Sequence, residues 1–459
     1  MSICRDILEA NPSPQGQRSS STMSLFPPDH ALRVTLADEV HARPPEAVQA
    51  PARASYVAVL VDGDQRAAEQ AHLRALCDAH GVQPPAAGAT HFRADIGPVR
   101  LKWERHGEFS GYTVIAKGVG ERPFANVAAA LLPPGWLAAL PGATVAAAHA
   151  KLLAAPDEPR LAQLLDEAFE GQPVSGSEIA DGAARVFTDF RLHDGCTRFV
   201  LVDRSLTERQ AGRVLQRLFE VEAYRIMALL ALPIARRQSP RIVQIEAALA
   251  VLTDRIARAV DGQADQDEQL LHELTRLAAE VESGLAASQF RFGACRAYYE
   301  LVTRRIEELR EGRLPGVQTL EEFMARRFTP AVATCNTVSQ RLHDLSERVS
   351  QASNLLSTRV DIARERQNQA LLASMDKRAR LQLRLQQTVE GLSVAAICYY
   401  AAGLVGYGAK ALKAAGLRID PDLAVGITIP IVAVAVMLAV RKARRHIEAH
   451  EGPSSQTFR

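Results

Sequence analysis

The chain has 459 residues, of which 47% are hydrophobic and 23% are charged, and this composition excludes a disordered or collagen-like protein. Its 54 Lys+Arg and 52 Asp+Glu residues leave a formal net charge of +2, so nucleic acid is not expected as a partner. The six cysteines include no C-x-x-C pair, which excludes the usual thiolate zinc site and favours a reduced, cytoplasmic setting.

The N-terminal half is predicted to be an α/β domain. Residues 1–30 are polar and rich in Ser and Pro, and we expect them to be disordered. Residues 31–235 are expected to form a cytoplasmic α/β domain in which strands and helices are mixed. The predicted strands are 54–61, 99–106, 109–117, 143–149, 185–192 and 197–203, and the predicted helices are 65–79 and 207–232.

An unusual polar segment precedes the first predicted strand. It places Glu39, His41, Arg43 and Pro44 within six residues. A histidine beside a carboxylate can be a tuned acid or base, and an arginine at a sheet edge can hold an anion. In the structural interpretation, Pro44 and the next proline force an extended chain and Arg43 binds carbonyl groups. We favour the structural interpretation.

Long helices are predicted between the α/β domain and the C-terminus. Residues 236–316 read as a helical pair, with Ser239-Pro240 as the start of its first helix. Residues 317–388 read as a short helix after Thr319 and a long stalk helix that begins at Thr329-Pro330. Apolar residues then alternate in steps of four and three, which is typical of a coiled coil. They are Val338, Leu342, Leu345, Val349, Ala352 and Leu356. This seam can pack against residues 240–311 or against other subunits.

The C-terminal region is predicted to be a transmembrane helical hairpin over residues 389–440. Its spans are 389–409, in which only Glu390 is charged, and 423–440, which carries no charge. These lengths suit the ~20 residues that cross ~30 Å of hydrocarbon. Gly403, Gly406 and Gly408 make part of the first span small, and Tyr407 lies among them. Small residues allow close helix contact in lipid, either between subunits or within the hairpin.

Basic residues flank the hairpin and predict its orientation. Four cations lie within 377–384, and the tail of residues 441–459 begins with Arg441 and Lys442. Positive charge marks the cytoplasmic side of short flanking segments. Both chain ends are therefore expected in the cytoplasm of a bacterial inner membrane, with a short loop outside. Residues 1–22 lack an apolar core, so no secretory signal peptide is expected.

Sequence motifs of common enzymes are absent. The chain has no G-x-x-x-x-G-K-[ST], H-E-x-x-H or G-x-S-x-G motif, and its histidines complete no metal site. We therefore expect a non-enzymatic protein with no catalytic residue, cofactor or metal.

The chain resembles a family of uncharacterised bacterial membrane-anchored proteins with one domain of unknown function. The resemblance rests on His41-Ala42-Arg43-Pro44, on the run from Tyr224 to Pro233, and on Glu390-Gly391-Leu392-Ser393. It covers most of the chain, and it implies an inner-membrane protein without supplying an activity or catalytic residues.

The layout is also similar to that of CorA-type magnesium channels. In those channels an α/β domain and a long stalk helix precede two spans and a basic tail, and the likeness implies a ring-like homo-oligomer. Their Tyr-Gly-Met-Asn signature corresponds here to Tyr407-Gly408-Ala409-Lys410, so only the first two residues match. Lys410 and Lys413 would repel a cation at an outer mouth.

Three hypotheses follow for a protein whose expected partners are the lipid bilayer, copies of itself and a cytoplasmic protein. The first is a CorA-like oligomeric ion conduit or a degenerate relative of one. The second is a membrane-tethered scaffold or sensor whose α/β domain binds a cytoplasmic partner or a small anion. The third is a membrane-held enzyme, for which His41 is the one candidate residue. We favour the non-enzymatic hypotheses.

Overall fold

The structure is a computed structural model that describes residues 29–34, 36–37, 44–120, 124–258, 264–416 and 420–450. The chain divides into two compact units. The first contains the described residues up to Leu249 together with Leu277–Val349, and the second contains Ala250–Arg276 and the described residues from Ser350 onwards. The disorder predicted for residues 1–30 falls almost entirely outside the described residues.

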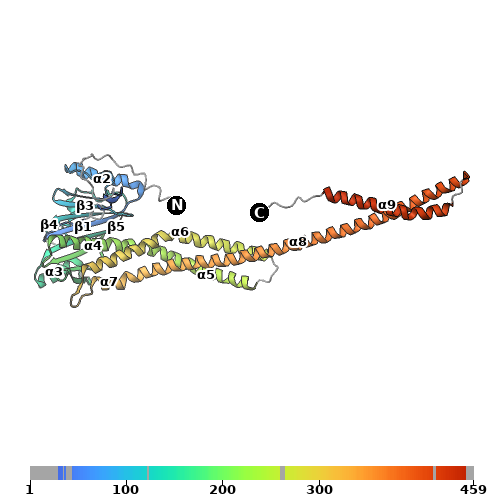
Figure 1. Cartoon of the computed structure of the whole chain (residues 1–459). Helices are drawn as coiled ribbons and strands as arrows, with labels where there is room; N and C mark the ends of the chain where they lie inside the picture. The colour runs from blue at the N-terminus through green and yellow to red at the C-terminus, as the bar shows by residue number, and fades with distance from the viewer. Residues whose placement is uncertain are drawn as a thin grey trace. The chain divides into compact units, whose positions relative to one another are not determined.

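One mixed sheet organises the first unit (Figure 1). Within the described residues it has ten strands in the order β10-β6-β7-β9-β5-β1-β4-β3-β2, with β8 paired to β9. The central strands β9 and β5 are parallel, and every other neighbouring pair is antiparallel. The strands are β1 Ala52–Leu60, β2 His91–Ile96, β3 Val99–Arg105, β4 Phe109–Lys117, β5 Ala143–Ala154, β6 Ser175–Ile179, β7 Ala184–Thr188, β8 Leu192–His193, β9 Cys196–Asp203 and β10 Gly312–Arg313.

The α/β prediction is confirmed, and most predicted strands lie within three residues of their observed positions. β5 is longer than predicted and ends at Ala154, whereas β7 ends early at Thr188. The strand expected over 185–192 is therefore wrong beyond Thr188. Residues 189–191 have no regular structure, and β8 begins at Leu192, where the chain pairs with β9 again.

Helices cover both faces of the sheet. One face is covered by α2 (Arg66–Ala79), η1 (Gly63–Gln65) and η2 (Ala128–Leu131), and by α3 (Glu158–Phe169), which packs in a separate hydrophobic cluster. The core beneath α2 holds Trp103 and Tyr112, both of which donate to the buried carboxylate of Glu69. On the other face lies α4 (Glu208–Leu229), whose Phe219 stacks on Tyr56 of β1.

Local capping signals position α4 and α7 where the sequence predicts them. Thr207 caps α4, and Thr319 caps α7 (Leu320–Arg327) in a capping box. The predicted helix start at Pro240 is wrong, because Pro240 lies inside α5 (Leu232–Arg258). Burial of Ala235 before it and of Ile242 after it holds this helix together, although an internal proline costs ~3 kcal/mol.

The remaining helices of the first unit pack through the predicted apolar seam. They are α6 (Ala264–Leu309), which begins in the second unit, and α8 (Thr329–Ala414), which continues into it. Val338, Leu342, Leu345 and Val349 of α8 are all at most 4% exposed. Arg341 of α8 also bonds Glu246 of α5 at 2.6 Å. This part of the seam is therefore covered by the chain's own helices.

The second unit contains the two C-terminal helices, α8 to Ala414 and α9 (Pro421–His450). By length and composition, each includes a stretch that could cross a membrane. Large apolar side chains in both stretches are exposed, for example Leu404 and Ile431. Two buried helices of a soluble core would not show this exposure.

Candidate functional site

The polar residues of interest lie on the sheet face that α2 and α3 cover. Three adjacent strands, β1, β5 and β9, carry basic side chains on this face. In register, Arg53 of β1 is paired with Lys151 of β5, and His149 of β5 is paired with Arg198 of β9. Such direct cross-strand neighbours lie ~5 Å apart at their Cβ atoms. We call Arg53, His149, Lys151 and Arg198 the basic face.

Phe124 lies over two members of the basic face. The Lys151 Nζ atom is 5.6 Å from its ring centroid, and the Arg198 Cζ atom is 5.4 Å from it. Phe124 has a positive φ of 55°, a conformation that costs a residue with a side chain about 1 kcal/mol or more. In this backbone conformation the Phe124 ring lies against both Lys151 and Arg198.

Burial changes the protonation of the basic face. Lys151 is 3% exposed. Burial, reinforced by nearby Arg53, lowers the pKa of Lys151 to about 8. Burial, reinforced by Arg198, lowers the pKa of His149 to about 4. At neutral pH this face therefore carries a charged lysine and two arginines beside a neutral imidazole.

The ends of the basic face differ in their partners. Arg198 donates to the carbonyl of Ala168 at 2.8 Å and to Glu170 at 3.1 Å, and it pairs with Asp194 at 3.3 Å. Arg53 donates to the carbonyl of Gly118 at 3.4 Å. Among the described residues, the buried Nε of Arg53 has no hydrogen-bond partner. The Arg53 end thus retains a donor for an added anion.

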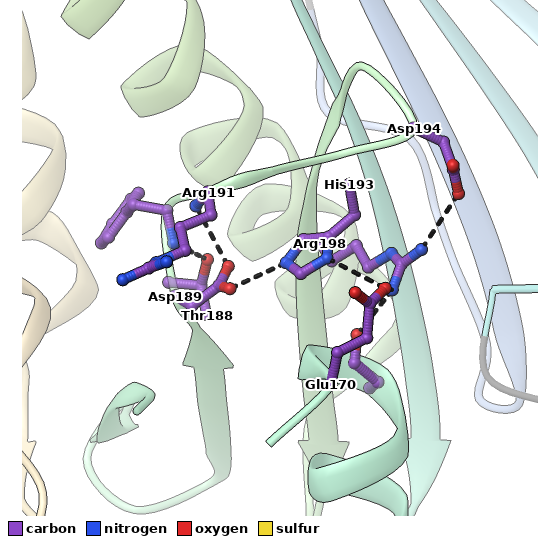
Figure 2. Close-up of polar contacts among 9 residues, drawn as sticks. Glu170, Thr188, Asp189, Arg191, His193, Asp194 and Arg198 are labelled. Carbon is purple, nitrogen blue, oxygen red and sulfur yellow. Dashed lines mark hydrogen bonds and ion pairs between the residues drawn. The ribbon is translucent and has the colours of Figure 1, made fainter. Parts of the chain in front are cut away.

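A charged cluster adjoins the Arg198 end (Figure 2). His193 lies between two carboxylates, with Nε2 2.7 Å from Asp189 Oδ2 and Nδ1 3.3 Å from Glu170 Oε1. The Asp189 side chain is fully buried, and its other oxygen accepts the Arg191 N–H. The hydrogen bond from His193 lowers the pKa of Glu170. The cluster ties the β8–β9 hairpin to the end of α3.

The backbone around this cluster is strained at three residues. Glu170, Phe190 and Asp194 have φ values of 55°, 54° and 52°, in the left-handed region that favours glycine. Such residues gather at functional sites, although they also form turns that the surrounding structure holds. Here Glu170 ends α3 and Asp194 forms the tight β8–β9 turn, so both also have a structural role.

The cluster resembles an oriented acid–base pair, and the one thiol opposite its histidine among the described residues is that of Cys196. Cys196 lies opposite His193 in the β8–β9 pairing, yet burial, reinforced by Asp194, raises the pKa of its thiol. In the part of the chain that the structure describes, no Ser, Thr or Cys side chain is bonded to His193, and no residue group could hold a metal ion. The contacts that the structure shows in this cluster are ion pairs and hydrogen bonds.

An open groove gives access to the Arg53 end of the basic face. Its volume is about 810 Å³, and Arg53, Arg100, Lys117, Asp95 and Glu208 supply its charged lining. Residues 47–52 form one wall. Arg100 is paired with Asp95 at 3.1 Å. The other two cations of the lining are Arg53, near the start of β1, and Lys117, at the end of β4.

The motif predicted at Glu39, His41, Arg43 and Pro44 comes just before residues 47–52, which line the groove. Glu39, His41 and Arg43 fall outside the described residues, whereas Pro44 is described and exposed. The segment that follows packs on α4, where Val48 N–H donates to the carbonyl of Glu208 at 3.0 Å. The role expected for the motif stays a prediction.

The residues predicted at the transmembrane interface do not share one face. Gly406 faces Val425 of α9, since a Cβ atom added to it would lie 3.1 Å from that side chain. Gly403, Tyr407 and Gly408 are exposed, and Glu390 is half-buried beside Gln386. Gly406 therefore takes part in packing within the hairpin, the alternative that the sequence left open.

The basic face was not predicted from the sequence, although β5 carries one signal of it. His149 and Lys151 interrupt the mostly apolar strand β5 at alternating positions, which places both on one face of the sheet. Their approach to Arg53 and Arg198 depends on the strand order β9-β5-β1, and the sequence does not reveal that order.

The chain is similar to a family of known proteins. The model of a family described as "Protein of unknown function (DUF3422)" matches residues 28–447. No curated protein matches the chain.

Proposed function

The chain belongs to this family of unknown function. We propose from its geometry that it is a membrane-tethered, non-enzymatic sensor whose α/β domain binds a small anion at the basic face. The observation that carries the proposal is the convergence of Arg53, Lys151 and Arg198 on one face of three adjacent strands. The groove at Arg53 supplies an entry path.

The chemistry of the basic face favours an oxyanion such as a phosphate or a carboxylate. Arginine presents a planar set of donors that matches these groups, and lysine adds a compact charge. The unpartnered Nε of Arg53 and the buried ammonium of Lys151 lie on paired residues of neighbouring strands. An anion bound there would supply an acceptor for the Arg53 Nε.

The membrane tether is supported by the exposure of both apolar helices. Large side chains such as Leu392, Leu404 and Leu438 are at least 59% exposed, and such a surface is unfavourable in water but favourable in lipid. The basic flanks at 377–384 and after residue 440 favour an inner-membrane hairpin with both chain ends in the cytoplasm.

Calorimetric titration of the full-length protein in mild detergent with inorganic phosphate tests the anion site. We expect one phosphate per subunit. Arg53→Met and Lys151→Met should each weaken binding by roughly tenfold or more, since a hydrogen bond to a charged group contributes about 1.5–3 kcal/mol. Arg74→Met is the control, because Arg74 is exposed on α2, away from the basic face. Wild-type affinity in the Lys151→Met protein would contradict the proposal.

A second candidate, the CorA-like ion conduit, is favoured by one observation. α8 is a single helix from Thr329 to Ala414, so the stalk helix and the first apolar stretch are continuous, as in the layout of those channels. Lys410 and Lys413 near its end oppose cation entry. Native mass spectrometry decides whether the idea survives: a closed ring of about five subunits, the number that the CorA likeness implies, would justify flux assays. A monomer would leave no ring to form a pore.

A further inference from the structure

A groove between α8 and α9 has a polar side and an apolar side. Its volume is about 420 Å³. The polar lining comes from Gln382, Gln386, Glu390 and Ser393, which recur along one side of α8. The apolar lining comes from Leu385, Val389, Val394 and Ile397 of α8 and from Val436 of α9.

We propose that this groove binds a phospholipid with a primary-amine headgroup, such as phosphatidylethanolamine. The inference rests on the membrane tether of the proposed function and is independent of the anion site. Two observations carry it: the position of the groove along the predicted span, and the charge of its polar side.

The groove has the length of one lipid leaflet. Val389 begins the apolar run, and Gln382 lies seven residues before it, about 10 Å away along the helix axis. Ile397 lies eight residues after Val389, about 12 Å in the other direction. The headgroup layer is about 5–7 Å thick, and half of the hydrocarbon core is about 15 Å thick. A lipid in the groove would therefore place its headgroup beside Gln386 and Glu390 and an acyl chain beside Ile397 and Val436.

The polar lining suits an amine headgroup. Glu390 lies at the boundary of the apolar run and accepts a hydrogen bond from Gln386 at 3.3 Å. A carboxylate has about four acceptor positions, so it can also accept an ammonium N–H. The amide groups of Gln382 and Gln386 can donate to the lipid phosphate.

Native mass spectrometry of the delipidated full-length protein tests the proposal. The protein in mild detergent is titrated with dioleoyl phosphatidylethanolamine, phosphatidylcholine and phosphatidylglycerol, which share their acyl chains. We expect one ethanolamine lipid per subunit, bound roughly tenfold more tightly than the other two, because only its ammonium donates N–H bonds to Glu390. Equal affinity for the three lipids, or a preference for phosphatidylglycerol, would overturn the proposal.

Variants separate the headgroup contact from the fold. Glu390→Gln should abolish the preference for the amine lipid, and Val436→Phe should weaken the binding of all three lipids by filling the groove. Gln387→Leu is the control and should bind the three lipids as the wild type does, because Gln387 is exposed and does not line the groove. An unchanged preference in Glu390→Gln protein that elutes like the wild type would also overturn the proposal.

The failure of this inference differs from a failure of the membrane tether. Protein that alkaline carbonate releases from membranes, and that stays monodisperse without detergent, would contradict the tether. Protein that stays embedded but shows no lipid preference would contradict only the headgroup assignment.

Discussion

His149 shows how one buried residue of the basic face sets a pH dependence. Its ring bonds Ser55 at 2.9 Å, and burial together with nearby Arg198 lowers its pKa to about 4, from 6.5 in the unfolded chain. Between pH 6.5 and pH 4 the unfolded chain binds a proton that the folded chain does not. The unfolded state is therefore favoured increasingly as pH falls through this window.

We expect the free energy of unfolding to decrease by up to about 3 kcal/mol from this residue between pH 6.5 and pH 4. His149→Gln removes the titrating ring, so urea unfolding of this variant should depend less on pH over the same window. Parallel pH profiles for the variant and the wild type would show that His149 binds a proton equally well in both states.

Asp189 is expected to stabilise the hairpin of β8 and β9. Its buried carboxylate accepts from His193 and from the Arg191 N–H, and both donors lose their acceptor in Asp189→Ala. The expected loss of stability is about 1–3 kcal/mol, measured by urea unfolding. The control is Asp194→Asn, since the Asp194 side chain is 96% exposed and asparagine tolerates its positive φ. A loss of similar size in both variants would contradict this role.

At the scale of elements, a glycine fixes the contact between α4 and the segment before β1. A Cβ atom added to Gly212 would lie 1.6 Å from the carbonyl oxygen of Glu46, so the backbone must move in Gly212→Ala. We expect that variant to lose about 1–3 kcal/mol, the cost of overpacking. Gly293→Ala is the control, because a Cβ there meets no atom within 4 Å, and alanine should stabilise α6 by up to about 1 kcal/mol. Both are measured by thermal unfolding, and stabilisation by Gly212→Ala would contradict the contact.

Elements with local signals could be predicted from the sequence, whereas those set by packing could not. Thr207 and Thr319 cap α4 and α7 because a cap needs only the residues next to it. Pro240 misled the prediction of α5 because buried residues on both sides outweigh its local cost. The basic face depends on three strands whose order the sequence does not reveal, so its residues could be recognised only in the fold.

At the scale of the whole molecule, the predicted hairpin places the two chain ends on one side of the membrane. In a chain with Cys4, Cys196 and Cys398 replaced by serine, Ala415→Cys should react with a membrane-impermeant maleimide in intact bacterial cells. Gln369→Cys in α8 should react only after lysis. Both side chains are exposed, so their labelling reports the side of the membrane rather than burial. The reverse pattern would contradict the orientation.

Phosphate binding by the full-length wild-type protein at pH 7 and at pH 9 tests the central claim most directly. The pKa of Lys151 is about 8, so its ammonium is largely charged at the lower pH and largely neutral at the higher. We expect calorimetry to detect one phosphate per subunit at pH 7 and much weaker binding at pH 9, with that difference lost in Lys151→Met. An absence of binding at pH 7, or the same dependence on pH in the wild type and in Lys151→Met, would contradict an anion site at the basic face.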